Sequence, residues 1–252
     1  MTVTSIHDLE PQLAANRRYW TGWDDQSDKP DSDLPIYRTD IPHPLMNGVL
    51  RIRDRSLEIA VETARQRLGG SVWAWWVGPD SDEGTADELL ARGATPVVQM
   101  PIMAVDIAGV TPADRPAGLK TQTITGRDEM TEYVGAYAGP LGIQGDLAQV
   151  VNRELNFGYP DVVRVAGVLD GRIAGTCTLS LGTEVAALYC VATDPEFRRR
   201  GIATALTLDA LHIAQQAGRR IATLQASSDG EPVYRRLGFE TVGHYRLFGF
   251  PA

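Results

Sequence analysis

The chain has 252 residues, of which 43% are hydrophobic and 22% are charged, and its formal net charge is −8. This composition is typical of globular proteins, and the length accommodates one large domain or two of ordinary size. The acidic balance disfavours nucleic-acid binding and suits cationic partners such as amines. No apolar run reaches the roughly 18–20 residues that cross a membrane. The first eleven residues also lack the apolar segment of a secretory signal, so we expect a cytoplasmic protein.

Apolar spacing in the first half predicts alternating helices and strands. We expect a helix at 55–68, an aromatic strand at 71–77, a short helix at 85–92 and an extended run at 95–107. The strand should place Trp73 and Trp75 on one face and Trp76 on the other, where core packing is their expected use. The segment Thr111-Pro-Ala-Asp-Arg-Pro116 has two prolines and no apolar periodicity, which predicts a linker.

The second half reads as a mixed α/β unit. Its predicted elements are strands at 119–125, 161–169, 172–181, 184–192, 221–226 and 239–250, with helices at 127–138, 147–157, 201–217 and 231–237. Asp170-Gly171 is a strong hairpin signal between two of these strands, and Gly218 is the expected stop of the long helix.

The two halves share an order of elements. Helix, strand, helix and strand follow one another from 55 to 107 and again from 201 to 250, and aligning Gly93 with Gly238 sets Leu89 against Tyr234. This order predicts that residues 1–112 are a degenerate copy of part of a second unit, residues 113–252. The alternative is an ordinary α/β lobe whose order coincides by chance.

The segment from Leu188 to Leu206 carries the strongest chemical signal. An apolar strand ends at Val191, a polar turn follows, and Arg198-x-x-Gly201-x-Ala203 opens a helix. Glycine lets the backbone approach a ligand, the first-turn N–H groups and the helix dipole favour an anion, and arginine adds charge-assisted hydrogen bonds to phosphate. The pattern predicts a cofactor that bears a diphosphate. No spacing of His, Cys, Asp and Glu suggests a metal, and Cys177 and Cys190 fit inert core thiols.

This turn resembles the Arg/Gln-x-x-Gly-x-Gly/Ala segment of the GNAT superfamily, the acetyl-CoA-dependent N-acetyltransferases. Tyr234-Arg-Arg-Leu-Gly-Phe239 is similar to the Tyr-x-x-x-Gly-Phe of the same family, and the resemblance covers roughly residues 115–252. It implies a GNAT-like mixed α/β fold, which in this chain would be tandem with a degenerate N-terminal copy.

The resemblance also implies which residues hold acetyl-CoA. The backbone from Val191 to Thr193 would follow the pantetheine arm, and the backbone from Arg199 to Thr204 would surround the pyrophosphate. Three consecutive arginines cannot all face one ligand, so we expect one or two to touch phosphate. The expected cofactor-binding residues are Cys190, Val191, Ala192, Thr193, Arg198, Arg199, Arg200, Gly201, Ile202, Ala203, Thr204, Ser227 and Tyr234.

Two side chains are the implied catalysts. Tyr234 would protonate the leaving thiolate, and Glu184 would act as the base, directly or through water; Glu184 equally fits a solvent-facing residue after a turn. Ser227 fits either a contact to pantetheine or Tyr234, or a plain loop serine. A main-chain N–H near Val191 would stabilise the oxyanion. Tyr189 and His43, in the stiff loop Ile41-Pro-His-Pro44, are candidates to line the acceptor cleft.

The expected activity is transfer of an acetyl group from acetyl-CoA to a primary amine, by direct attack in a ternary complex. The acceptor would be a small molecule or a peptide, with no nucleic acid, membrane or metal involved. The alternative is a non-catalytic acyl-CoA-binding or regulatory protein that kept the cradle and lost the chemistry.

Overall fold

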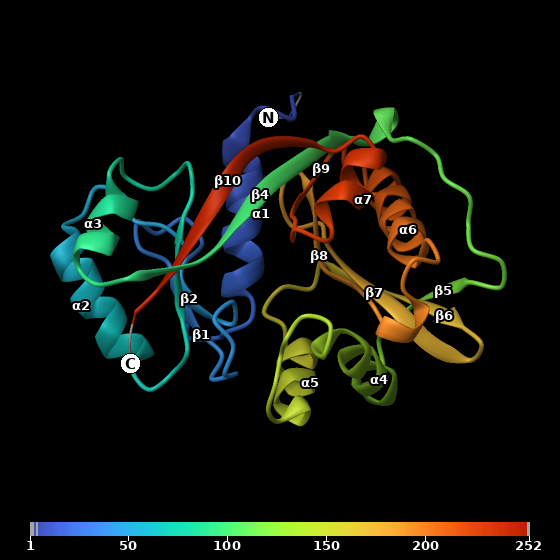
Figure 1. Ribbon diagram of the computed structural model, residues 1–252, viewed down its shortest axis with the longest axis horizontal. Helices are drawn as coiled ribbons and strands as arrows, with labels where there is room; N and C mark the ends of the chain where they lie inside the picture. The colour runs from blue at the N-terminus through green and yellow to red at the C-terminus, as the bar shows by residue number, and fades with distance from the viewer. Residues whose placement is uncertain (1–2, 4, 251–252) are drawn as a thin grey trace.

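The computed structural model describes residue 3 and residues 5–250 of the chain. Within this range ten strands form one sheet, in the order β1-β2-β3-β10-β4-β9-β8-β7-β6-β5 (Figure 1). The strands are β1 (Ile36–Arg38), β2 (Asn47–Val49), β3 (Ala74–Val77), β4 (Thr95–Asp106), β5 (Lys120–Thr123), β6 (Val162–Leu169), β7 (Arg172–Ser180), β8 (Ala186–Thr193), β9 (Ile221–Gln225) and β10 (Glu240–Gly249).

Helices cover both faces of the sheet. They are α1 (Leu9–Thr21), α2 (Leu57–Leu68), α3 (Thr85–Ala91), α4 (Arg127–Ala138), α5 (Leu147–Leu155), α6 (Ile202–Gln216) and α7 (Glu231–Arg236), with the short 3-10 helices η1 (Ile107–Gly109) and η2 (Pro195–Phe197). α1, α4 and α5 pack over a core that includes Trp76 and Tyr245. Trp75 and Phe248 pack with α2 and α3 instead, because neighbouring residues of a strand point to opposite faces.

The sheet has an internal two-fold order about the antiparallel pair of β4 and β10. β1, β2, β3 and β10 pair with the same directions as β7, β8, β9 and β4: antiparallel, parallel, antiparallel. Each half therefore contributes its last strand to the sheet of the other half. This arrangement matches the predicted repeat, and Figure 1 shows β4 and β10 running side by side between the two groups of helices.

Two equivalent turns show the same repeat at atomic detail. The N–H of Ala94 donates to the carbonyl of Leu89 at 3.1 Å, and the N–H of Phe239 donates to the carbonyl of Tyr234 at 3.0 Å. Between these pairs lie Gly93 and Gly238, with φ angles of 86° and 98°. Leu89 therefore occupies the place of Tyr234, as the sequence alignment predicts.

The expected boundary between residues 112 and 113 falls in the irregular connection between η1 and β5. The sheet continues across this boundary, because β4 pairs with both β9 and β10. One hydrophobic core also combines residues of both halves, such as Trp20 and Tyr189. The two halves thus form one continuous structure.

Most predicted elements are present within a few residues of their expected ends. The hairpin at Asp170-Gly171 is confirmed, with φ angles of 54° and 78° that a type I′ turn requires. The sequence analysis missed α1, β1 and β2. The prediction about the first eleven residues lies partly outside the described range. In the described part of the chain, no helix is long and apolar enough to cross a membrane.

Candidate active site

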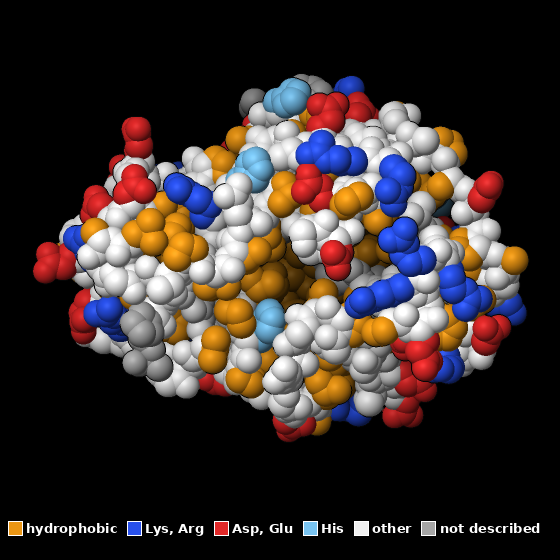
Figure 2. All heavy atoms as spheres, in the orientation of Figure 1, with side chains coloured by type: hydrophobic (Ala, Val, Ile, Leu, Met, Phe, Trp, Pro, Cys, Tyr) orange, Lys and Arg blue, Asp and Glu red, His pale blue; other side chains and the backbone are white. Residues whose placement is uncertain are grey.

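A crevice opens where β8 separates from β9. The two strands pair in parallel only from Ala186 to Leu188, although β8 continues to Thr193. β9 instead follows β4, and the N–H of Ala226 donates to the carbonyl of Pro101 at 3.1 Å. Figure 2 shows a hollow lined by hydrophobic side chains near this part of the sheet, with Lys and Arg side chains along one side. Crevices at the carboxyl ends of parallel strands are the usual ligand sites of such sheets.

A β-bulge lies in β8 at the edge of this crevice. Thr176 pairs with Ala192 and Thr178 with Tyr189, so Cys190 and Val191 together lie opposite Cys177. Cys190 has a φ angle of 47°, a left-handed conformation that residues with a side chain rarely adopt. Such bulges break the regular ladder and redirect backbone groups, and they are frequent beside active sites.

The turn after β8 leads into α6 with free N–H groups in the first turn of the helix. Gly201, at a φ angle of 79°, precedes the helix without a capping side chain. The N–H of Ala205 makes the first helical hydrogen bond, to Gly201, so the N–H groups of the three residues between them have no helical acceptor. Together with the helix dipole, such N–H groups are suited to bind an anion.

The side chains of this turn differ in burial and in their contacts. Phe197 is buried, and the guanidinium groups of Arg172 and Arg200 lie over its ring at 5.4 and 5.5 Å. Arg198 and Arg199 are exposed, and no described residue forms an ion pair with either. Arg200 is exposed as well, and its stacking on Phe197 distinguishes it from Arg198 and Arg199; which of the three touch phosphate stays a prediction.

Tyr234 and Ser227 lie on either side of Gly230. A Cβ atom on Gly230 would be 3.1 Å from the Tyr234 ring and 3.2 Å from the Ser227 hydroxyl. The Ser227 hydroxyl accepts from the N–H of Gly230 at 3.1 Å, so this serine closes the turn before α7. It still has a proton to donate.

The phenol of Tyr234 is 7% exposed. Burial raises the pKa of Tyr234 well above its ordinary value, and the nearby Cys177 raises it further. Tyr234 packs in the same hydrophobic core as Leu188 of β8 and Ile202 of α6. The phenol is therefore protonated at neutral pH and lies on the α6 side of the sheet.

Glu184 does not lie with these residues. It is exposed in the turn before β8, on the far side of the strand from the α6 turn. Five residues separate it from Cys190, and only 186–189 of these belong to β8, which is roughly 13 Å of strand from Ala186 to Cys190. His43 accepts the N–H of Leu45 on Nδ1 at 3.2 Å, and burial lowers its pKa although a bond to the backbone of Leu141 raises it. It connects its own loop to the loop after α4.

A buried polar network beneath the bulge escaped the sequence analysis. The Tyr19 hydroxyl of α1 lies 3.6 Å from the Cys190 Sγ, and the Tyr19 ring stacks on Tyr189 with centroids 3.5 Å apart. Beside them, Glu154 accepts hydrogen bonds from Tyr137 at 2.8 Å and from Arg164 at 2.6 Å. These contacts join residues far apart in sequence, so no local pattern indicates them.

Neither cysteine thiol is suited to act as a nucleophile. Burial raises the pKa of Cys190 to about 12, and it raises the pKa of Cys177 as well. Both thiols are therefore protonated at neutral pH, as expected for core cysteines. Among residues 3 and 5–250, no group of three or more His, Cys, Asp and Glu side chains could hold a metal ion.

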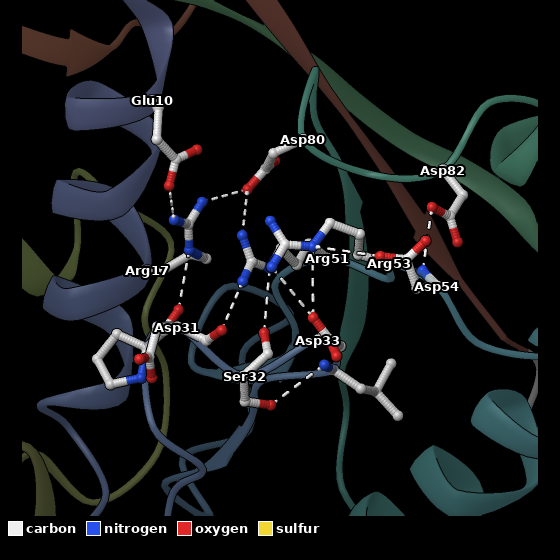
Figure 3. A network of polar contacts seen from close by, with 12 residues as sticks. Glu10, Arg17, Asp31, Ser32, Asp33, Arg51, Arg53, Asp54, Asp80 and Asp82 are labelled. Carbon is white, nitrogen blue, oxygen red and sulfur yellow. Dashed lines mark hydrogen bonds and ion pairs between the residues drawn. The ribbon is translucent and has the colours of Figure 1, made fainter.

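In the N-terminal half, the place equivalent to the crevice lies beyond β2, and polar contacts occupy it (Figure 3). The chain after β2 bonds across the gap, because the N–H of Asp82 donates to the carbonyl of Ile52 at 2.9 Å. Arg51 turns inward, where it donates to the carbonyls of Ser32 and Asp31 at 3.1 and 2.7 Å and lies 3.6 Å from Asp80. Among the described residues, these contacts bridge the place that corresponds to the crevice at β8.

Comparisons with known proteins agree with this geometry. Residues 136–239 match the model of the acetyltransferase (GNAT) family. Over 60 residues the chain is 43% identical to an uncharacterized N-acetyltransferase of Methanocaldococcus jannaschii; the match covers 23% of this chain and 26% of the relative, about a quarter of its length.

Two solved structures share the fold over most of the chain. A GCN5-related N-acetyltransferase from Kribbella flavida has a TM-score of 0.68 at 20% identity, covering 99% of this chain and 97% of that one. A tandem GNAT protein from the clavulanic acid biosynthesis pathway has a TM-score of 0.57 at 18% identity, covering 87% and 79%. The α6 turn, the bulge of β8 and Tyr234 all lie inside the segment matched by the family model, so residues 136–239 of this chain are similar to the acetyltransferase (GNAT) family.

Proposed function

We propose that this protein transfers an acetyl group from acetyl-CoA to a primary amine of a small molecule or peptide, within a ternary complex. The observation that carries the proposal is the meeting of three features at one end of β8. These are an anion site at α6, a bulged strand edge and a buried protonated phenol, all inside the family segment.

The residues at this end of β8 fit the cofactor. The N–H groups at the start of α6, with Arg198 or Arg199, would hold the pyrophosphate. The edge of β8 beyond Leu188 has no parallel partner strand, and its backbone would pair with the amides of the pantetheine arm as with an added peptide strand. Bound acetyl-CoA supplies an activated acyl group as a thioester.

The reaction forms a nitrogen–carbon bond and breaks the carbon–sulfur bond. A main-chain N–H at the bulge stabilises the negative charge that develops on the carbonyl oxygen. Tyr234 gives its proton to the departing sulfur, and the proton released by the attacking nitrogen returns to the phenolate through water. Burial keeps the phenol in its protonated form, which is the form that a general acid needs.

We assign no side chain as the base. Glu184 lies in the turn before β8, six positions before Cys190, and its role as the base stays a prediction. An acceptor that binds in its neutral form needs no base, and the rate then follows the fraction of free amine as the pH rises.

Replacement of Tyr234 by Phe tests the proposal. We expect kcat to fall by roughly 10²–10³-fold, the usual effect of losing a general acid, while affinity for acetyl-CoA is retained. Steady-state kinetics with an amine panel measures the first quantity and calorimetric titration measures the second. Tyr245→Phe is the matched control, because Tyr245 is an equally buried phenol that packs with Trp76 on the opposite face of the sheet.

Full activity in Tyr234→Phe would contradict the role of the phenol. Binding of acetyl-CoA by native protein without turnover of any amine would instead favour the non-catalytic acyl-CoA-binding protein.

A further inference from the structure

The carbonyl group of Cys190 has an unusual partner. The Thr176 hydroxyl of β7 donates to this carbonyl at 2.7 Å, and Thr176 is completely buried. In a regular antiparallel ladder main-chain N–H groups satisfy such carbonyls, but a bulge disrupts that pattern. A side chain from the neighbouring strand thus makes a bond at the point where the ladder is irregular.

This hydrogen bond fixes the direction of one peptide plane. The peptide between Cys190 and Val191 is trans and planar, so its C=O and N–H groups point in opposite directions. The carbonyl points to Thr176 on β7, and the Val191 N–H therefore points away from β7. On that side β8 has no parallel partner, because its pairing with β9 ends at Leu188. The N–H is directed into the crevice.

The bulge needs such a restraint. Cys190 is held at a φ angle of 47°, which is unfavourable for a residue with a Cβ atom. Such a conformation persists only where the surroundings impose it. The Tyr19 hydroxyl contacts the side chain of Cys190 and Thr176 holds its carbonyl, so the residue is restrained at both groups.

We infer that Thr176 is a positioning residue of the acyl-transfer site. Its hydroxyl holds the Cys190–Val191 peptide so that the Val191 N–H donates to the thioester carbonyl oxygen. The inference rests on the proposed function and assigns it one further residue, which touches neither substrate. Without this bond the peptide is free to rotate, and the donor is no longer aimed at the oxygen where negative charge develops.

The variant that isolates the hydroxyl is Thr176→Val, which keeps the shape of the side chain and removes the donor. Thr176→Ser restores the donor. The matched control is Thr223→Val, because the Thr223 hydroxyl of β9 is equally buried and also donates to a main-chain carbonyl, that of Met103 at 3.1 Å. Circular dichroism and thermal melting compare the folding of all three variants with the native protein.

The measurement is the infrared carbonyl stretch of acetyl-CoA labelled with ¹³C at the carbonyl, bound without an acceptor. Native protein should shift this stretch to lower frequency, Thr176→Val should lose the shift, and Thr176→Ser and Thr223→Val should keep it. In parallel, kcat should fall roughly 10²-fold in Thr176→Val, as expected when a donor is misplaced by about 1 Å, with little change in the KM for acetyl-CoA.

The outcomes distinguish a failure of the role of Thr176 from a failure of the proposed acetyl transfer. If native protein binds acetyl-CoA and shifts the stretch, but Thr176→Val shifts it equally, the role of Thr176 is overturned and the proposed function stands. If folded native protein does not bind acetyl-CoA, the proposed function and this inference are both overturned. If Thr176→Val fails to fold, Thr176→Ser decides: a native shift and kcat support the role, and their loss despite the restored hydroxyl overturns it.

Discussion

At the scale of single residues, Cys190 of the C-terminal half is in contact with the N-terminal half. Its left-handed conformation costs roughly 1–2 kcal/mol, which the surrounding contacts must offset. One of these contacts comes from Thr176 in the neighbouring strand and another from Tyr19 in α1, which belongs to the N-terminal half. The N-terminal half therefore supports the backbone geometry of the half that contains the crevice.

The position of Glu184 gives a prediction at the same scale. Because Glu184 is exposed in the turn before β8, at the opposite end of the strand from the bulge, we expect Glu184→Gln to leave kcat/KM for an amine close to native across the pH range. Pre-steady-state and steady-state rates between neutral and alkaline pH measure this. Glu240→Gln, an exposed glutamate at the start of β10, serves as the control. A loss of roughly 10²-fold at neutral pH, recovered at high pH, would make Glu184 the base after all.

The sequence indicated those residues of the site that form local patterns. Gly201 and Tyr234 each lie in a short motif, because a helix start and a tight turn impose their own residue types. Thr176 and Tyr19 act through contacts that span 14 and 171 positions of the chain. Residues so far apart meet only through the register of the strands and the packing of α1, which no local pattern encodes.

At the scale of elements, α1 carries a buried polar network. Arg17 donates to the carbonyl of Pro30 at 2.9 Å and to Glu10 at 2.5 Å, and it also pairs with Asp80 (Figure 3). Asp80 additionally faces Arg51, so one carboxylate serves two buried guanidinium groups. Burial raises the pKa of Asp80, whereas Arg17 and then Arg51 lower it. The network ties α1 to the loop after β3.

Replacement of Asp80 by Asn should therefore weaken the fold markedly. Removing the charge leaves the buried Arg51 without a carboxylate and Arg17 with Glu10 alone, and we expect the free energy of unfolding to fall by about 3–5 kcal/mol. Asp33→Asn is the matched control, because the Arg53–Asp33 pair is half exposed and should contribute about 1 kcal/mol or less. Urea unfolding measured by circular dichroism gives both values. Equal stability of the two variants would show that the network does not hold α1 in place.

The same network explains why α1 was not predicted. Its buried face includes Gln12, Asn16 and Arg17, so polar and apolar residues do not separate into the stripe that identifies an amphipathic helix. By contrast, α4 was predicted with its observed ends, because its buried residues recur at helical spacing. β1 and β2 have three residues each, too few for alternation to be recognised.

At the scale of the whole molecule, the halves exchange strands. β4 of the N-terminal half pairs with β9 of the C-terminal half, and β10 of the C-terminal half pairs with β3 of the N-terminal half. Sequence order predicted the repeat of elements, but the exchange depends on which strand edges meet in space. A cut at residue 112 would remove β4 from β9 and β10 together, so the site depends on the complete sheet.

Calorimetric titration with acetyl-CoA and with desulfo-CoA decides whether this protein holds the cofactor at the end of β8. We predict one site per chain, because the crevice exists at β8 and is filled at the equivalent place beyond β2. Gly201→Glu should abolish binding, since it adds a negative charge at the start of α6 and a side chain at a φ angle of 79°. Ser56→Glu, at the equivalent start of α2, is the matched control and should bind as native protein does. A second site per chain, equal loss in both variants, or no binding by the folded native protein would contradict the account.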